Sequence, residues 1–184
     1  MPENTLQGRE AGYLELLSKL FCRTLVRGVY KQALEAGNDL TAVQLSCLHY
    51  LNRHENVNAS SIAEGLVISR AAATNLVERL VRKGLVTREV NPEDRRQVFI
   101  QLSPLGKEAL ARALSHQREY FSRIVSRMKE EDLVALRQGL RAFIQAGMID
   151  GGMLQDICTR CGVEHMAACP VGLILTDLDI DFKF

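Results

Sequence analysis

The chain has 184 residues, of which 47% are hydrophobic and 24% charged, an ordinary profile for a soluble globular domain with an appendage. No apolar run reaches the roughly 18 residues that a membrane span needs, and the polar N-terminus lacks the basic and apolar regions of a secretory signal, so we expect a cytoplasmic protein without a membrane partner. The net charge of +1 selects no partner by itself.

The first third of the chain has the pattern of two helices. Residues 10–36 carry apolar side chains at three- and four-residue steps, namely Leu14, Leu17, Phe21 and Leu25. Cys22 lies among these apolar neighbours, and we expect it to be buried in the core. The stretch Gly37-Asn38-Asp39 breaks the pattern. Thr41, with Gln44 three residues later, predicts a capping box at the start of the second helix.

Two further short helices meet at a tight turn. The first runs from about Ser60 to Leu66, with Asn58 or Ser60 as its cap. Ser69 is a suitable cap for the second, over residues 70–83. This spacing is typical of a helix-turn-helix, in which the second helix lies in the major groove of DNA.

A β-hairpin is predicted directly after these helices. Gly84 stands where a left-handed residue ends a helix. Residues 85–90 and 97–102 have strand character, and the turn residues Asn91-Pro92-Glu93-Asp94 separate them. A hairpin in this position is the wing of a winged helix-turn-helix, a device for holding duplex DNA.

Two more helices follow the hairpin. Ser103-Pro104 has the chemistry of a helix start, and the helix is expected to reach about Met128. The next helix covers residues 130–146. Acidic residues occupy its first turn, where the helix dipole favours negative charge, and Gly147 ends it. The predicted fold is therefore mainly α with a small β-hairpin wing.

The helix over residues 70–83 has one apolar face and one polar face. Ala73, Leu76, Val77 and Leu80 are expected to pack inward. The side chains left outside are Ser69, Arg70, Ala72, Thr74, Asn75 and Arg79. Asn reads adenine, Arg reads guanine, and Thr or Ala contacts a thymine methyl group, whereas a serine hydroxyl and the amides of a helix start suit a phosphate.

The turn of the wing supplies a second candidate contact. Arg95 and Arg96 follow Glu93 and Asp94 at the hairpin tip. A narrow minor groove attracts arginine strongly. Asp94 is placed to hold one guanidinium in a fixed rotamer, so that less side-chain entropy is lost on binding.

The run ISRAAATNLVERLVRKGLVTREVNPEDRRQVFIQLSPLGKEAL resembles the MarR family of bacterial transcription regulators. The specific part is Asp94-x-Arg96 followed by Ile100-x-Leu102-Ser103-x-x-Gly106, and the likeness covers about residues 10–147. The resemblance implies a winged-helix homodimer in which Arg96 enters the minor groove, Asp94 orients it, and Thr74 and Asn75 face bases. It also implies that the first helix and the last two helices form the dimer interface.

The chain then divides into four expected segments. Residues 1–38 form an N-terminal dimerisation helix, residues 39–103 the winged helix-turn-helix, and residues 104–149 the C-terminal dimerisation helices. Residues 150–184 form a cysteine-rich tail that departs from the family pattern.

The tail carries the cluster Cys158-x-x-Cys161-x-x-x-His165-x-x-x-Cys169-Pro170. Three thiolates and an imidazole form a set that binds zinc, and three cysteines with a proline after the last also resemble iron–sulfur loops. Spacing does not separate the two metals. The same positions also form one stripe of a helix, which would be a packing face without metal. The expected cofactor is thus Zn²⁺, an iron–sulfur cluster or none.

The sequence contains no phosphate-binding glycine loop, nucleophile elbow or spaced carboxylate pair, so we expect no enzymatic activity. The expected function is that of a transcriptional regulator, a repressor that binds a palindromic operator in double-stranded DNA. Its activity would respond to the metal or redox state of the tail or to a small-molecule effector. The alternative is a metal or redox protein that uses the winged-helix scaffold to contact proteins, which the wing arginines disfavour.

Overall fold

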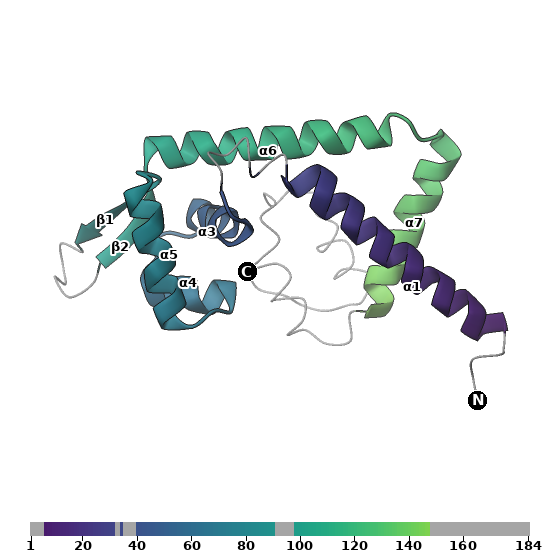
Figure 1. The fold of residues 1–184 in the computed structure, drawn as a ribbon, viewed down its shortest axis with the longest axis horizontal. Coiled ribbons are helices and arrows are strands. Elements are labelled where there is room, and N and C mark those ends of the chain that lie inside the picture. Colours follow the sequence, from purple (N-terminus) through teal and green to yellow (C-terminus); the bar gives the residue numbers. More distant parts are fainter. Residues whose placement is uncertain (1–5, 32–33, 35–39, 91–97, 148–184) are drawn as a thin grey trace.

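The computed structural model describes residues 6–31, 34, 40–90 and 98–147. The described part is mostly helical with one two-stranded antiparallel hairpin, as predicted (Figure 1). The elements in chain order are α1 (Leu6–Thr24), the π-helix η2 (Leu25–Tyr30), α3 (Ala42–Arg53), α4 (Ala59–Leu66), α5 (Arg70–Arg82), β1 (Val86–Val90), β2 (Val98–Leu102), α6 (Pro104–Val125) and α7 (Glu130–Gly147).

The helices start where side-chain chemistry caps them. Thr41 and Gln44 form the predicted capping box, in which each side chain accepts a hydrogen bond from the backbone N–H of the other. Asn58, and not Ser60, caps α4 by accepting from the N–H of Ser61 (2.9 Å). Ser69 caps α5 by accepting from the N–H of Ala72 (3.1 Å). These local bonds explain why the predicted starts agree closely with the structure.

The core of the described chain lies in a head built from α3, α4, α5, the hairpin and the first turns of α6 (Figure 1). The largest fully buried side chains are Leu48, Ile62, Leu80, Leu85, Val77 and Cys47. Cys47 is surrounded by this apolar packing, and burial raises the pKa of its thiol to about 12. The thiol is therefore protonated and unreactive at neutral pH.

Hydrogen bonds hold the hairpin to the rest of the head at two places. In the head, the N–H of Ile100 in β2 donates to the carbonyl oxygen of Val57 (2.7 Å), so the loop before α4 pairs with the outer side of β2. At the base of the hairpin, the Ser103 hydroxyl donates to the carbonyl oxygen of Gly84 (2.6 Å) and accepts from the N–H of Gly106 (2.9 Å). Gly84 has the predicted left-handed conformation (φ 69°). The wing consequently holds a set position beside α5.

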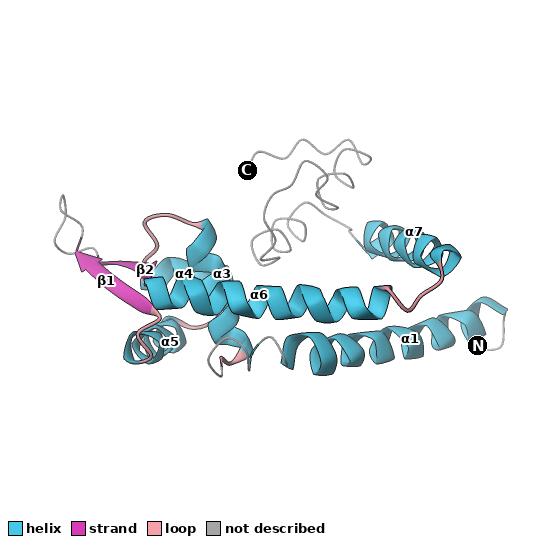
Figure 2. Ribbon diagram, turned by 90° about the horizontal axis from the view of Figure 1, so that it is seen from above, coloured by secondary structure: helices cyan, strands magenta, loops and turns pink. Residues whose placement is uncertain are grey.

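The remaining helices form an arm that extends from the head. Figure 1 shows α1 and α7 below α6, and Figure 2, seen from above, shows them displaced to opposite sides of it. The described side chains of α1 are exposed, and α7 has no buried residue. The expectation that Cys22 is buried in the core is wrong for the single chain, because Cys22 lies on this exposed α1. Among the described residues, no helix is long and apolar enough to cross a membrane.

The first helix also differs from its predicted form. The sequence predicts one regular helix over residues 10–36, whereas the backbone changes from α1 to the π-helix η2 at Leu25. Gly28 lies within η2, and the ring of Tyr120 from α6 packs directly on it. Glycine is a weak helix former, and π-helical turns interrupt α-helices at such irregular positions.

Candidate nucleic-acid interface

Helix α5 separates the two faces that its sequence predicts. Its inward side chains Ala73, Leu76, Val77 and Leu80 are buried. The outward side chains are all exposed, namely those of Ser69, Arg70, Ala72, Thr74, Asn75 and Arg79. The structure therefore brings these predicted candidates together on the free surface of one helix.

Two hydroxyl groups on this surface already have partners within the helix. The Ser69 hydroxyl oxygen accepts the capping bond from the N–H of Ala72, which leaves its own proton for a further acceptor. The Thr74 hydroxyl donates to the carbonyl oxygen of Arg70 (3.0 Å). Because its donor is engaged, Thr74 offers a methyl group and an acceptor oxygen to anything that contacts α5.

The sequence patterns did not single out three residues of the same face. Ala71, Glu78 and Arg82 are exposed on α5, and they point away from its buried stripe. A strict helical period applied to residues 70–82 finds them, because Ala71 and Glu78 are seven residues apart, or about two turns. Alanine and glutamate are also residue types that contact base edges, so the sequence alone carries the signal that identifies Ala71 and Glu78.

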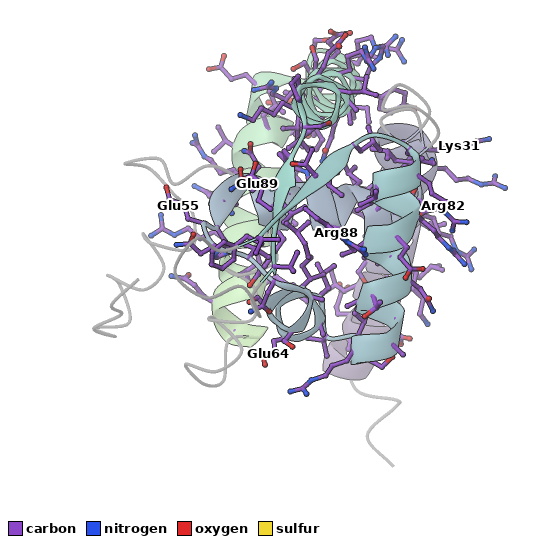
Figure 3. All side chains as sticks on the ribbon, turned by 90° about the vertical axis from the view of Figure 1, so that its left-hand side faces the viewer. Lys31, Glu55, Glu64, Arg82, Arg88 and Glu89 are labelled. Atoms are coloured by element: carbon purple, nitrogen blue, oxygen red, sulfur yellow. The ribbon has the colours of Figure 1, made fainter. Side chains whose placement is uncertain are left out.

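The exposed face of α5 has an excess of positive charge. Arg70, Arg79 and Arg82 lie on α5, and none of them takes part in an ion pair among the described residues. Arg88 adds an exposed positive charge on β1. In Figure 3, Arg82 lies on the outer side of α5, whereas Glu55 lies on the opposite side of the head. A polyanion is attracted to the arginine side of such a head.

The C-terminal end of α5 is held to α3 by a hydrogen bond. The Lys83 ammonium group lies 3.4 Å from Oε1 of Gln44, the residue that also completes the capping box of α3. Gln44 is buried at 5% exposure, so this amide is an internal support of the head. The contact helps to hold the orientation of α5 relative to the helices behind it.

The remaining predicted candidates lie outside the described residues. These are the wing residues Asp94, Arg95 and Arg96 and the tail residues Cys158, Cys161, His165 and Cys169. The described strands end at the pair Val90 and Val98. Within the described chain, no group of three or more His, Cys, Asp or Glu side chains could hold a metal ion.

Known proteins are similar to this chain in sequence and in architecture. The model of the MarR family matches residues 40–98, the helix-turn-helix and most of the hairpin. The transcriptional repressor MdtR of Bacillus subtilis is 28% identical over 111 residues, which cover 60% of this chain and 72% of MdtR. The uncharacterised helix-turn-helix transcriptional regulator YfiV of the same organism is 30% identical over 108 residues, which cover 59% of this chain and 68% of YfiV.

A solved structure agrees with these relatives. A single-site mutant of MepR from S. aureus, bound to an oligodeoxyribonucleotide, is 26% identical and superposes with a TM-score of 0.59. The likeness covers 73% of this chain and 96% of that chain. Fold, family model and relatives agree, and the chain belongs to the MarR family of winged-helix transcriptional regulators.

Proposed function

We propose that this chain is a sequence-specific, DNA-binding transcriptional repressor that acts as a homodimer on a palindromic operator. The observation that carries the proposal is the exposed face of α5 beside the wing, with small polar side chains and with arginines that form no ion pair within the described chain. The relatives support it, since MdtR is described as a repressor and the MepR mutant is bound to an oligodeoxyribonucleotide.

The exposed apolar surface of the arm supports the dimer. Helix α1 exposes a row of large apolar side chains: Tyr13, Leu14, Leu16, Leu17, Leu20 and Phe21. Phe143 of α7 is 71% exposed, and Phe121 of α6 is also exposed. Monomeric soluble proteins rarely leave such surfaces open to water. A second copy of the chain would bury them and would present two α5 helices to half-sites about one DNA turn apart.

The roles of single residues follow from groove chemistry. Ser69 and the first amides of α5 would bind a phosphate, and Asn75 would read adenine. Ala72 and the methyl group of Thr74 would contact thymine methyl groups, whereas Arg70 and Arg79 would bind guanine or phosphate. At the wing, Arg95 and Arg96 would reach the minor groove, with Asp94 orienting Arg96.

Fluorescence anisotropy with duplex DNA taken from beside the protein's own gene tests this proposal. Arg96→Ala and Arg79→Ala should each weaken binding and reduce the slope of log affinity against log salt by about one for each phosphate that the variant no longer binds. Arg118→Ala, on the exposed surface of α6, should change neither quantity. A protein that remains monomeric and ignores every duplex at low salt would refute the proposal and favour the protein-contact alternative.

We further propose that the tail binds Zn²⁺ or an iron–sulfur cluster through Cys158, Cys161, His165 and Cys169. Soft thiolates and an imidazole suit either group. Metal analysis and a visible absorption spectrum of anaerobically purified protein distinguish the two, and a colourless, metal-free protein contradicts both. If the site is a signal, metal loss or oxidation changes operator affinity without unfolding. If it stabilises the dimer, the same treatment lowers the melting temperature and the dimer content.

A small-molecule effector is a further part of the proposal. An effector would act by favouring one of two arrangements of the paired α5 helices, only one of which matches the spacing of the half-sites. Titration of the protein–operator complex with candidate aromatic ligands, followed by anisotropy, tests this point.

A further inference from the structure

Glu78 occupies the outward stripe of α5. Ala71, Thr74, Asn75 and Glu78 are spaced i, i+3, i+4 and i+7, and all four are exposed on the side away from the buried stripe of the helix. Ala71 and Glu78 differ in direction by only about 20° around the helix axis. Recognition helices that follow the major groove read base edges with residues at this same spacing.

Side-chain length grows along the stripe. It begins with an alanine, continues with threonine and asparagine, and ends with the longer glutamate. A helix that enters the major groove by its N-terminus lies closest to the bases there and farther from them one or two turns later. Short side chains at the start and a long one at Glu78 therefore allow the whole stripe to reach one groove floor.

The carboxylate of Glu78 has no partner among the described residues. Two other exposed helical acids are paired four residues on, Glu15 with Lys19 and Glu108 with Arg112. Glu78 has Arg82 at the same spacing, yet no hydrogen bond or ion pair joins these two side chains. Within the part of the chain that the structure describes, its oxygens are thus open to a donor on DNA.

An unpaired carboxylate on this face weakens DNA binding unless a nucleobase donates a hydrogen bond to it. Phosphates repel it, as do the O6 and N7 acceptors of guanine and the O4 of thymine. Adenine offers an amino group next to the N7 acceptor, whereas cytosine offers its N4 amino group with no neighbouring major-groove acceptor on the same base. Glutamate accepting from cytosine N4 is accordingly the favourable pairing.

We propose that Glu78 is a specificity-determining residue that accepts a hydrogen bond from the N4 amino group of a cytosine in each half-site. The proposal rests on the DNA-binding function proposed above and deepens it. Glu78 then acts in two ways: it favours cytosine at one position and disfavours other bases and random duplex.

Selection from a pool of duplexes with a random central region, followed by sequencing of the bound fraction, tests the assignment. The wild-type protein should enrich a symmetric motif with cytosine at one position of each half. Glu78→Gln should lose that preference by about tenfold or more and shift it toward adenine, because glutamine binds adenine N6 and N7 bidentately. It should also bind random duplex roughly twofold more tightly, since one repulsive charge is gone.

Glu55→Gln is the matched control. It removes the same charge from the opposite side of the head (Figure 3), so it should leave the enriched motif unchanged. Melting curves of both variants should coincide with that of the wild-type protein, because both acids are exposed.

The outcomes separate this inference from the proposed function. If the wild-type protein enriches no sequence at low salt, DNA binding itself is refuted. If it enriches a motif that lacks a cytosine shared by both halves, or one that Glu78→Gln reproduces with the same preferences, the role of Glu78 is refuted and DNA binding stands.

Discussion

The ring of Tyr120 in α6 lies so close to Gly28 in η2 that a Cβ atom at Gly28 would come within 2.5 Å of the Tyr120 Cε1 and Oη atoms. The guanidinium carbon of Arg123 lies 5.3 Å from the centroid of the same ring, in cation–π range. The contact connects η2 to α6, and only a residue without a side chain permits it.

Gly28→Ala should be neutral or destabilising, against the usual trend in helices. Alanine normally stabilises a helix by about 1 kcal/mol relative to glycine, but overpacking of this kind costs about 1–3 kcal/mol. In a Tyr120→Ala background the ring is absent, and the same change should stabilise by about 1 kcal/mol. Urea unfolding of the four proteins in this cycle measures the sign change, and equal effects in both backgrounds would contradict the contact.

Val67→Asn should stabilise the protein by about 1 kcal/mol, because it relieves backbone strain. Val67 ends α4 in the left-handed region (φ 52°, ψ 50°) and is 64% exposed, so it has strain and little packing to lose. Valine is strongly disfavoured in this conformation, whereas asparagine tolerates it. Val43→Asn, at an exposed helical position of α3, is the control and should stay within about 0.5 kcal/mol of zero. A thermal shift that is the same for both variants would argue against strain at Val67.

Thr74→Val should keep operator affinity, whereas Thr74→Ser should weaken it. The Thr74 hydroxyl already donates to the Arg70 carbonyl oxygen, so the methyl group is the part offered to a thymine. Valine retains a methyl group in that place and serine removes it. Anisotropy with the selected operator measures both affinities, and the reverse order would show that the hydroxyl reads the base.

The stability of the head should fall in mild acid because of His54. Burial, and secondarily the charge of Arg53, hold the pKa of His54 below its ordinary value of 6.5, and its ring lies 4.3 Å from that of Tyr50. The folded chain thus binds this proton less tightly than the unfolded chain. Protonation favours unfolding, so the free energy of unfolding should decrease as the pH drops below about 6.5 toward the lower folded pKa.

Urea unfolding of the wild-type protein and His54→Asn between about pH 7.5 and 5 isolates this contribution. The variant should show a shallower decline over this window than the wild-type protein. His116→Asn, at an exposed position of α6, is the control and should leave the decline as it is. Identical pH profiles for the wild-type protein and His54→Asn would show that the histidine is not responsible.

Sequence patterns predict the elements of the head well, because the signals that set them are local. Thr41, Ser69 and Ser103 each cap a helix through a bond to a residue three positions on, which the sequence displays directly. The buried stripe of α5 follows likewise from the helical period. The exposed face of α5 is therefore predictable, although the sequence analysis passed over Ala71 and Glu78 on it.

The features that the sequence did not reveal depend on which elements meet. The exposure of Cys22, the π-helical turn at Gly28 beneath Tyr120 and the pairing of Ile100 with Val57 all involve residues far apart in the chain or the absence of a neighbour. By itself the sequence determined where the helices and strands of the head begin, which side chains α5 buries and the family to which the chain is similar. Only the tertiary structure decided which surfaces stay open, because burial and close approach are properties of packed elements and not of local bonds.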